Sequence, residues 1–374
     1  MVEHHLHIVC LDVPYPADYG GIFDLFYKIA ALHKQGIKIH LHCFEYGRGK
    51  QDELNKYCAE VFYYKRKFGL KGFSFRLPYI VSSRINDELP VNLLKDDYPV
   101  LLEGIHCTYY LHKNILLNKK VFVRLHNVEF QYYKQLSKSE TSLIKKLYFL
   151  HESMLLKKYE KKIAAKATFI AVALPDQKIY EKMFNAKAIK YLPVFLPFTL
   201  INGKEGKGNY CLYHGNLSVA ENEKAGIWLL KNIFNELEIP LVIAGKDPSK
   251  KLERIAHRNI NTCLVANPAE QELAELIREA QINILPSFNS TGIKIKLLNA
   301  IFNGRHCLVN TSAIAGTGLK PLCTVSDDSR KFKENITELY NRSFTREEVI
   351  LRSKTLLPLY DNEKNARHLI QWIY

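Results

Sequence analysis

The chain has 374 residues, more than one hydrophobic core usually supports, so two domains are expected. Its 47% hydrophobic and 24% charged residues are ordinary for a globular protein, and no run approaches the ~18 apolar residues that a membrane-spanning helix needs. The formal net charge of +15 favours anionic partners, namely nucleic acid, anionic lipid or phosphorylated ligands, with a basic surface that binds nothing as the alternative.

The eight cysteines are scattered singly, and none belongs to a C-x-x-C pair. Several lie in strand-like apolar runs, where cysteine acts as a small apolar residue: Cys10, Cys43, Cys211 and Cys307. This usage predicts a reducing, cytoplasmic environment and gives no disulfide or metal site. We also expect no signal peptide, because the N-terminus lacks a basic start and a long apolar core.

The chain opens with the pattern of a doubly wound α/β sheet. The predicted elements are a strand at 6–11, a loop at 12–21, a helix at 22–35 and a strand with one polar face at 37–44. The loop ends in Gly20-Gly21, a pair that would let the backbone approach a ligand closely. The spacing is not that of a nicotinamide-type fingerprint, and a tight turn without a ligand is the alternative.

Residues 61–84 mix aromatic side chains with cations: Lys65, Arg66, Lys67, Lys71, Arg76 and Arg84. This mixture suits a membrane interface, where rings sit at headgroup depth and cations meet anionic lipid. The same mixture could bind single-stranded nucleic acid by stacking. A partly buried hairpin or helix pair with a solvated basic face is the third interpretation.

Polar side chains follow two of the later strands of the first half. Further strands are predicted at 100–102, 121–125, 168–173 and 189–193, and a helix at 175–184. Glu103 ends the first of these strands, and His126 and Glu129 follow the second. Because ligands gather at the carboxyl ends of strands in open α/β sheets, we expect these three residues near a binding site.

Residues 142–165 predict one long helix. Its apolar residues form a stripe at helical spacing: Leu143, Leu147, Leu150, Met154 and Ile163. Lysines give the rest of the helix a basic character. The expected structure is a core helix with solvated lysines, and contact with a membrane surface is the alternative.

The α/β pattern restarts after a polar, glycine-rich linker at residues 202–209. The second half predicts strands at 210–213, 241–244, 261–265, 282–285 and 307–309, helices at 221–236, 270–280 and 293–302, and mostly helix beyond residue 325. The sequence therefore predicts two Rossmann-like domains.

The loop 287–292 precedes the helix 293–302 at the end of a parallel strand. Free amides and the positive end of the helix dipole meet there and suit a phosphate. Lys294 and Lys296 lie in the first turn, where a cation is costly unless an anion is bound, so they strengthen the prediction of a phosphate site. A purely structural turn is the alternative.

Together, the two domains and four local motifs resemble the GT-B architecture of nucleotide-sugar glycosyltransferases, and glycosyltransferase family 4 in particular. The motifs are the proline- and glycine-containing loop from Pro14 to Gly21, LHNVE at 125–129, YHGNLS-x-x-E-N at 213–222, and the LP…GIKIKLLNA…G segment at 285–304. The resemblance implies two domains that face a central cleft. It also places residues 1–200 in an acceptor domain, 201–357 in a donor domain, and a C-terminal helix at 358–374 back on the first.

The resemblance implies a role for each motif. Gly20 and Gly21 would approach the donor pyrophosphate, and His126, with Glu129, would act at the donor sugar near the reacting carbon. The remaining donor-binding residues implied are Gly215, Asn216, Lys246, Gly292, Ile293, Lys294, Lys296 and Asn299. The sequence has no D-x-D metal site, so we expect no metal or other cofactor, and cations and helix amides must stabilise the departing nucleoside diphosphate.

The sequence departs from the family pattern at two places. Thr291 and Asn299 stand where a Glu-x7-Glu pair is usual, and a neutral pair binds sugar and ribose differently. The usual Arg/Lys pair after the opening strand of the second domain is replaced by Asn216 and Asn222, while Lys246 could supply one cation.

We therefore predict a glycosyltransferase that moves a hexosyl unit from a nucleotide-diphosphate sugar to a glycan or lipid-linked acceptor, with retention, in the assembly of cell-surface polysaccharides or glycoconjugates. Its expected location is the cytoplasm, at the inner face of the membrane. One alternative is a catalytically impaired GT-B relative that acts as a binding or scaffold protein. A basic nucleic-acid-binding protein is the other, although no recognition motif is present and no nucleic-acid partner is expected.

Overall fold

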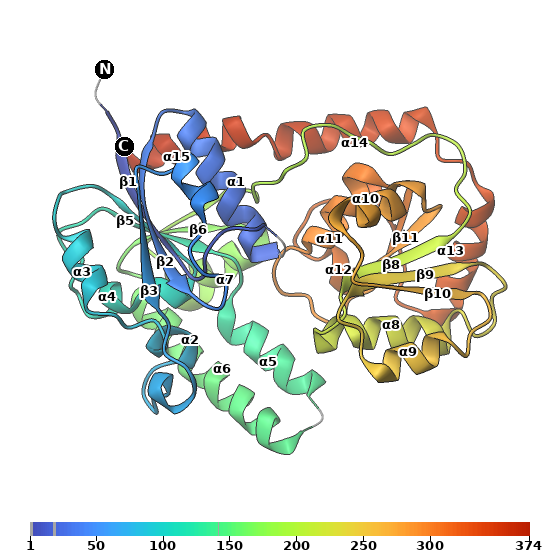
Figure 1. Cartoon of the computed structure of the whole chain (residues 1–374), viewed down its shortest axis with the longest axis horizontal. Coiled ribbons are helices and arrows are strands. Elements are labelled where there is room, and N and C mark those ends of the chain that lie inside the picture. Colours follow the sequence, from blue (N-terminus) through green and yellow to red (C-terminus); the bar gives the residue numbers. More distant parts are fainter. Residues whose placement is uncertain (1–2, 18–19, 141) are drawn as a thin grey trace. The chain divides into compact units, whose positions relative to one another are not determined.

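The computed structural model describes residues 3–17, 20–140 and 142–374 (Figure 1). The chain forms two compact units, of which the first comprises Met1–Pro197, Thr291–Ile293 and Tyr360–Tyr374. The second comprises Phe198–Ser290 and Lys294–Leu359. The predicted boundaries lay at 200/201 and 357/358, and the segment Thr291–Ile293 was expected in the second domain.

The first unit is built on a seven-stranded parallel sheet of order β3-β2-β1-β4-β5-β6-β7. Its strands are β1 His5–Cys10, β2 Lys38–Glu45, β3 Glu60–Lys65, β4 Val100–Glu103, β5 Val121–Leu125, β6 Thr168–Ala171 and β7 Ala188–Tyr191. Its helices are α1 Gly20–Lys34, α2 Tyr79–Ser82, α3 Glu88–Leu93, α4 Tyr109–His112, α5 Glu129–Ser139, α6 Leu143–Ile163, α7 Leu174–Phe184 and α15 Asn362–Ile373, with short 3-10 turns η1 Asp52–Lys56, η2 Gly69–Gly72 and η3 Ile105–Cys107. Crossover helices between parallel strands confirm the predicted Rossmann-like α/β class.

Alternate side chains of the strands belong to two apolar layers, one on each face of the sheet. Ile8 and Leu41 lie in the layer that α1 and α15 cover, and Leu369 of α15 belongs to this layer. Val9 and Val123 lie in the opposite layer, which the helices α5, α6 and α7 help to cover. The predicted apolar role of Cys10, Cys43, Cys211 and Cys307 is confirmed, since all four are buried.

Most of the predicted apolar stripe of α6 does not lie in the core, so the expected core helix is wrong for the first half of α6, whereas the second half packs in the core as expected. Leu143, Leu147, Leu150 and Met154 are exposed, and of the five stripe residues Ile163 is the one that is buried. The buried side of α6 carries Glu152, Ser153, Leu156, Tyr159 and Glu160. Polar groups on that side find partners in neighbouring elements: Ser153 Oγ, for example, donates to the carbonyl of Phe130 at 2.7 Å.

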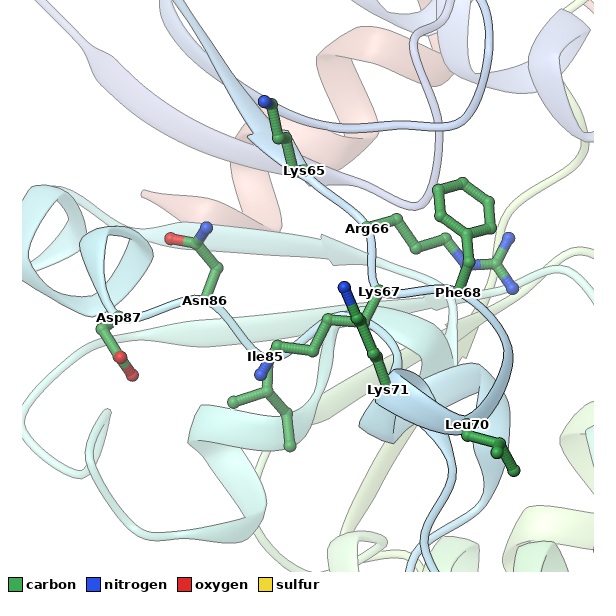
Figure 2. A pocket seen from close by; sticks show the side chains of 9 residues that line it. All are labelled: Lys65, Arg66, Lys67, Phe68, Leu70, Lys71, Ile85, Asn86 and Asp87. Carbon is green, nitrogen blue, oxygen red and sulfur yellow. The ribbon is translucent and has the colours of Figure 1, made fainter.

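The basic aromatic segment 61–84 is neither a hairpin nor a helix pair. It begins as the edge strand β3, continues through η2 and ends in α2. The chain after β3 lines an open groove of about 820 Å³ (Figure 2). The lining residues are Lys65, Arg66, Lys67, Phe68, Leu70, Lys71, Ile85, Asn86 and Asp87.

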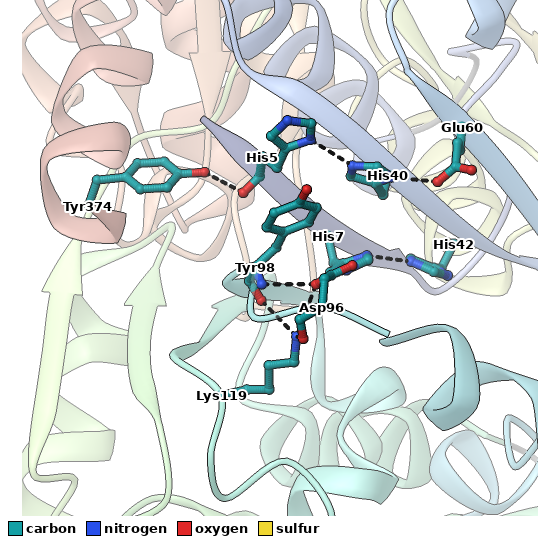
Figure 3. Close-up of polar contacts among 9 residues, drawn as sticks. All are labelled: His5, His7, His40, His42, Glu60, Asp96, Tyr98, Lys119 and Tyr374. Carbon is teal, nitrogen blue, oxygen red and sulfur yellow. Dashed lines mark hydrogen bonds and ion pairs between the residues drawn. The ribbon is translucent and has the colours of Figure 1, made fainter. Parts of the chain in front are cut away.

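In the predicted polar face of residues 37–44, His42 is buried, His40 is half-buried and Lys38 is exposed, and the two histidines pair with those of β1 (Figure 3). His7 Nδ1 lies 2.9 Å from His42 Nε2, and His5 Nδ1 lies 3.0 Å from His40 Nε2. Asp96 continues the first chain of hydrogen bonds, at 3.1 Å from His7 Nε2. These lateral hydrogen bonds give the ring nitrogens of His7 and His42 partners, which allows both side chains to be buried.

The second unit holds a six-stranded parallel sheet of order β10-β9-β8-β11-β12-β13. Its strands are β8 Cys211–Asn216, β9 Leu241–Lys246, β10 Thr262–Ala266, β11 Ile282–Ile284, β12 His306–Val309 and β13 Thr324–Val325. Its helices are α8 Ala220–Asn232, α9 Lys250–Ala256, α10 Glu270–Glu279, α11 Ile295–Asn303, α12 Thr311–Ile314, α13 Ser329–Asn341 and α14 Arg346–Leu359, with the 3-10 turn η4 Lys320–Leu322. The prediction of mostly helix beyond residue 325 is confirmed.

The predicted linker 202–209 is packed against its own unit rather than free. Asn202 N donates to the carbonyl of Phe302 at 2.8 Å, and Gly206 exchanges two backbone hydrogen bonds of 2.9 Å with Phe344. A Cβ on Gly208 would collide with the backbone at Glu279–Gln281, so glycine there serves close packing. In the described part of the chain, no helix is both long and apolar enough to cross a membrane.

Candidate functional site

His126 and Glu103 meet at the carboxyl ends of β5 and β4, as the strand-end argument predicted. His126 Nε2 lies 3.0 Å from Glu103 Oε2, and its Nδ1 lies 3.9 Å from Asp24 Oδ2. Burial acts to raise the pKa of Glu103, but Lys28 and the His126 hydrogen bond outweigh burial and hold that pKa below its ordinary value. An ionised Glu103 can only accept, so the proton of this hydrogen bond belongs to His126 Nε2.

Two buried cations balance the two carboxylates. Lys28 Nζ lies 2.7 Å from Glu103 Oε1 and 3.1 Å from Asp24 Oδ2. Arg124 binds Asp24 through Nε and Nη2, with hydrogen bonds of 3.1 and 3.0 Å, while Nη1 donates to the carbonyl of Leu192 and Nη2 also donates to that of Pro193. Burial would raise the pKa of Asp24, yet Arg124 and Lys28 hold it far below its usual range. The charges of the two carboxylates are thus balanced by those of Lys28 and Arg124. All of these side chains are buried, and His126 is the member of the network that is partly exposed.

Asp24, Glu103 and His126 each place one possible metal-ligating atom within 4.8 Å of the others. Both carboxylates are already ion-paired with Lys28 or Arg124 at 2.7–3.1 Å. A divalent ion would have to displace these buried cations or sit beside them, so the donor set does not fit a resident metal.

Glu129 is the first residue of α5 and lies away from solvent, with 4% of its surface exposed. Glu160 of α6 accepts the backbone amides of Glu129 and Phe130 at 3.1 and 3.0 Å, and so caps the start of α5. Burial, reinforced by the Glu160 carboxylate, raises the pKa of Glu129 to about 8, and burial raises that of Glu160 to about 8. The structure thus associates Glu129 with Glu160; a catalytic role for Glu129 stays a prediction.

Gly20 and Gly21 are the first residues of α1. The amides that begin this helix have no partner within the helix and carry the positive end of its dipole, which suits the predicted phosphate contact. Asp24 lies one turn further along α1, so the start of this helix adjoins the Glu103–His126 network. Two residues of the predicted loop 12–21, at positions 18 and 19, lie outside the described residues.

Several predicted site residues of the second unit lie at the end of β8. Lys296 Nζ donates to Asn222 Oδ1 at 2.8 Å and lies 4.9 Å from the ring centroid of Tyr213. The side-chain Nδ2 of Asn222 donates to the backbone carbonyl of Asn216 at 2.9 Å, so the Asn222 side chain links Asn216 to Lys296. Burial lowers the pKa of Lys296 to about 8, and Glu221 opposes this shift.

Gly215 and Lys246 lie on the neighbouring strands β8 and β9. Gly215 is opposite Gly245 in the parallel ladder, and a Cβ on Gly245 would overlap the carbonyl oxygen of Gly215. Lys246 ends β9 with an exposed side chain, and its carbonyl accepts the amide of Leu217 at 2.9 Å. The two glycines therefore allow the close approach of β8 and β9 just before these strands end at Asn216 and Lys246.

The predicted helix 293–302 begins two residues later than expected, because α11 starts at Ile295. Gly292 has φ +65°, a left-handed conformation that suits glycine at the turn before the helix, and Ile293 follows it. Lys294 directly precedes α11, whereas Lys296 is in its first turn. Asn299, the predicted ribose ligand, accepts a hydrogen bond from Asn303 Nδ2 at 2.7 Å.

Three residues of the Glu103–His126 network, and the partner of Glu129, were not predicted from the sequence: Asp24, Lys28 and Arg124, and Glu160. Asp24 and Lys28 are four residues apart on one helix, and Arg124 interrupts the apolar strand 121–125. Charged residues within apolar patterns could therefore have indicated a buried ion-pair network. His214 was also missed; it is buried within β8, and its Nε2 has no hydrogen-bond partner among the described residues.

Comparison with known proteins adds independent information. Residues 208–342 match the family model Glycosyl transferases group 1. A Klebsiella pneumoniae protein named "Uncharacterized 44.6 kDa protein in cps region" is 29% identical over 332 residues, which cover 83% of this chain and 84% of that protein.

Solved structures share the fold at low sequence identity. TarM matches with a TM-score of 0.71 at 9% identity, over 100% of this chain and 99% of that chain. The α,α-trehalose-phosphate synthase (UDP-forming) of Burkholderia xenovorans, in complex with glucose-6-phosphate, matches with a TM-score of 0.66 at 10% identity over 99% of both chains. Anabaena Alr3699/HepE, in complex with UDP and glucose, matches with a TM-score of 0.66 at 11% identity over 99% of both chains. The chain therefore has the two-domain GT-B fold of these structures, and its residues 208–342 form a domain that matches the Glycosyl transferases group 1 model.

Proposed function

We propose that the protein transfers a hexosyl unit from a nucleotide-diphosphate sugar to a glycan or lipid-linked acceptor. The observation that carries this proposal is the position of Lys296 in the group 1 domain. Its ammonium is held by Asn222 at the first turn of α11, where helix amides and a left-handed Gly292 also favour an anion.

The reaction needs this arrangement because the leaving group is a nucleoside diphosphate. Negative charge develops on its phosphate oxygens as the glycosidic bond breaks, and preorganised cations and amides stabilise that charge without reorganisation. Lys294 and Lys296 supply cations in this proposal, while Asn216 and Lys246 line the neighbouring strand ends. Solved relatives of the same fold bind UDP with glucose, as Anabaena Alr3699/HepE does.

In the first unit we assign His126 to the donor sugar and Glu103 to the orientation of His126. The buried acceptor at Nε2 fixes the tautomer and the direction of the ring, so the imidazole presents one face and Nδ1 in a constant position. Retention of configuration rests on the resemblance to glycosyltransferase family 4.

The acceptor and location are the finer part of the proposal. The relative encoded in a cps region supports a role in the assembly of a cell-surface polysaccharide. We further propose that the enzyme works in the cytoplasm at the inner face of the membrane, where lipid-linked acceptors are available.

A thermal-shift panel of UDP-, GDP- and ADP-sugars tests the donor site, followed by a turnover assay with each donor that binds. We expect one nucleotide class to raise the melting temperature of the wild-type protein. Lys294→Ala combined with Lys296→Ala should abolish that shift, because two cations leave the phosphate site.

The matched control is Lys250→Ala combined with Lys251→Ala, which removes two exposed lysines from the N-terminus of α9 in the same unit. This control should leave the shift unchanged. An equal shift in the Lys294/Lys296 variant would remove those lysines from the phosphate site.

A binding protein without turnover is the second candidate, favoured by the neutral pair Thr291 and Asn299. Asn299 carries an amide where the family pattern has a carboxylate for the ribose. Its Oδ1 already accepts a hydrogen bond from Asn303. A donor-induced shift without turnover of any donor would favour this candidate over the enzyme.

A further inference from the structure

We infer that the first unit docks on an anionic lipid bilayer through one surface, made of the exposed stripe of α6 and the basic groove after β3. This inference deepens the proposed membrane location, but it depends on neither the donor nor the reaction. Its evidence is the side-chain exposure, the charge and the contacts of two adjoining segments.

The stripe of α6 presents apolar side chains that a core helix would bury. Leu143 is 76% exposed and Met154 is 58% exposed, and Leu147 lies between them on the same helical face. The spacing of four, three and four residues along 143, 147, 150 and 154 keeps these side chains in one row. Aliphatic side chains in a row along a helix insert at the boundary between lipid headgroups and acyl chains.

Lysines lie within this row and after it. The exposed lysines of α6 are Lys145, Lys146, Lys157, Lys158, Lys161 and Lys162. In the ranges that the structure describes, none of them forms an ion pair with a carboxylate. The helix is therefore an apolar strip with uncompensated cations, which complements an anionic surface.

The groove after β3 repeats this combination on a second element (Figure 2). Leu70 at its rim is 92% exposed, and Phe75 just beyond it is 79% exposed. The lining cations are Lys65, Arg66, Lys67 and Lys71, and Asp87 is the one carboxylate among the lining residues. A volume of about 820 Å³ has room for a phosphate-bearing headgroup.

The two segments are joined by side-chain and backbone contacts. Tyr79 N, at the start of α2, donates to Glu152 Oε2 of α6 at 2.7 Å. The Arg66 guanidinium lies 5.8 Å from the ring centroid of Tyr79 and 4.4 Å from that of Tyr46. The chain after β3 and the helix α6 are therefore joined through α2, so the groove and the stripe adjoin on the first unit and can engage a flat surface together.

A bilayer fits this surface better than the alternatives. Single-stranded nucleic acid would use the cations and rings of the groove, but it would leave the aliphatic row of α6 unused. A second copy of the chain would cover the row, but its own lysines would then face these lysines. An anionic bilayer satisfies both the apolar row and the cations.

The test is flotation of the full-length protein with vesicles of phosphatidylglycerol and phosphatidylcholine, compared with pure phosphatidylcholine. We expect binding to the anionic vesicles, at least tenfold weaker binding to the neutral ones, and a loss of affinity as salt is added. Leu147→Ser with Met154→Ser, Leu70→Ser with Phe75→Ser, and Lys67→Glu with Lys71→Glu should each weaken anionic binding at least tenfold. All six side chains are exposed, so these variants should fold, and circular dichroism checks that they do.

The controls carry the same chemistry on the second unit. Ile260→Ser removes an apolar side chain that is 99% exposed, and Lys250→Glu with Lys251→Glu reverses two exposed charges. Both should leave vesicle binding unchanged. The donor-induced thermal shift, measured on every variant without vesicles, should stay at the wild-type value, so a failed docking surface is distinguished from a failed donor site.

Three outcomes would overturn the inference. The first is equal binding to neutral and anionic vesicles, or none to either. The second is a dimer, seen by light scattering without lipid, that the Leu147/Met154 variant turns into a monomer without any change in vesicle binding. The third is salt-sensitive binding to single-stranded nucleic acid that the groove variant abolishes while vesicle binding persists.

Discussion

His126 is oriented by a carboxylate that is itself held by a buried lysine. Glu103 therefore has two separable roles, because its Oε2 accepts from His126 while its Oε1 pairs with Lys28. Removing its charge leaves Lys28 with Asp24, which Arg124 already neutralises. This arrangement allows the structural and the positioning contributions of Glu103 to be measured separately.

We predict that Glu103→Gln lowers the unfolding free energy by about 3 kcal/mol, because it leaves a buried cation undercompensated. Adding Lys28→Met should recover most of that loss, since both members of the pair are then gone. Turnover should stay low in the double variant, because the acceptor carboxylate of His126 is still missing. Urea denaturation and a turnover assay measure the two effects, and recovery of turnover together with stability would show that Glu103 has no positioning role.

The histidine pairs of β1 and β2 predict a pH effect on stability. Burial lowers the pKa of His7 despite Asp96, and burial together with His7 and His40 lowers that of His42 further. The unfolded chain then binds more protons than the folded chain below about pH 6.5, so this stability is present above that pH and is lost as pH falls through the folded values.

The expected result is a drop in the urea midpoint of the first unit between pH 7.5 and pH 5. His7→Gln with His42→Gln should flatten that drop, although it lowers stability at pH 7.5. The matched control is His257→Gln, an exposed histidine of the second unit, which should leave the drop intact. If the drop has the same size in the His7/His42 variant, its cause lies elsewhere.

Few of these polar contacts could be predicted from the sequence, and the reason is physical. A strand-end rule places Glu103 and His126 together, because it depends only on local order along the chain. The partners of Asp24 and Arg124, or of His7 and His42, come from elements far apart in sequence. No local periodicity specifies which buried charges will meet.

At the scale of elements, the alternation of strands and helices was predicted well, whereas the environment of a helix face was not. The apolar row of α6 has the spacing of a core helix, yet the row is exposed, and the buried side of the helix carries Glu152 and Glu160 beside the core residues Leu156, Tyr159 and Ile163. The two carboxylates cap the amides of Tyr79, Glu129 and Phe130. The inward side of α6 thus combines apolar packing with acceptors for the backbone donors of neighbouring helices, which periodicity alone does not reveal.

The close approach of β8 and β9 gives a prediction for the donor site. Gly245→Ala would place a methyl group on the Gly215 carbonyl oxygen and force the two strands apart, at a cost of about 1–3 kcal/mol. The donor-induced thermal shift should fall with it, because Asn216 and Lys246 leave from the same strands.

The matched control is Gly226→Ala in α8, where the nearest neighbours of a Cβ would be 3.5 Å away. That substitution should be neutral or stabilise the helix by up to about 1 kcal/mol. A Gly245 variant that melts and binds donor like wild type would mean that the strands can separate at no cost.

At the scale of the whole molecule, we propose two different uses for the +15 charge. In the second unit, Lys296 is held by neighbouring side chains, which suits a small anion. In the first unit, the lysines of α6 and of the groove are exposed, which suits an extended anionic surface. Composition alone predicted an anionic partner, and only side-chain burial separates the two kinds of partner.

The path of the chain through the two units has a consequence for synthesis. The first unit takes its last helix from residues 362–373, where Leu369 and Ile373 complete an apolar layer against α1. Tyr374 Oη also donates to the carbonyl of His5 at 2.6 Å, which ties the end of the chain to its first strand. The second unit has all its residues once position 359 has been made, although its synthesis starts later. On the ribosome, the domain that is translated first is therefore the last to close its core.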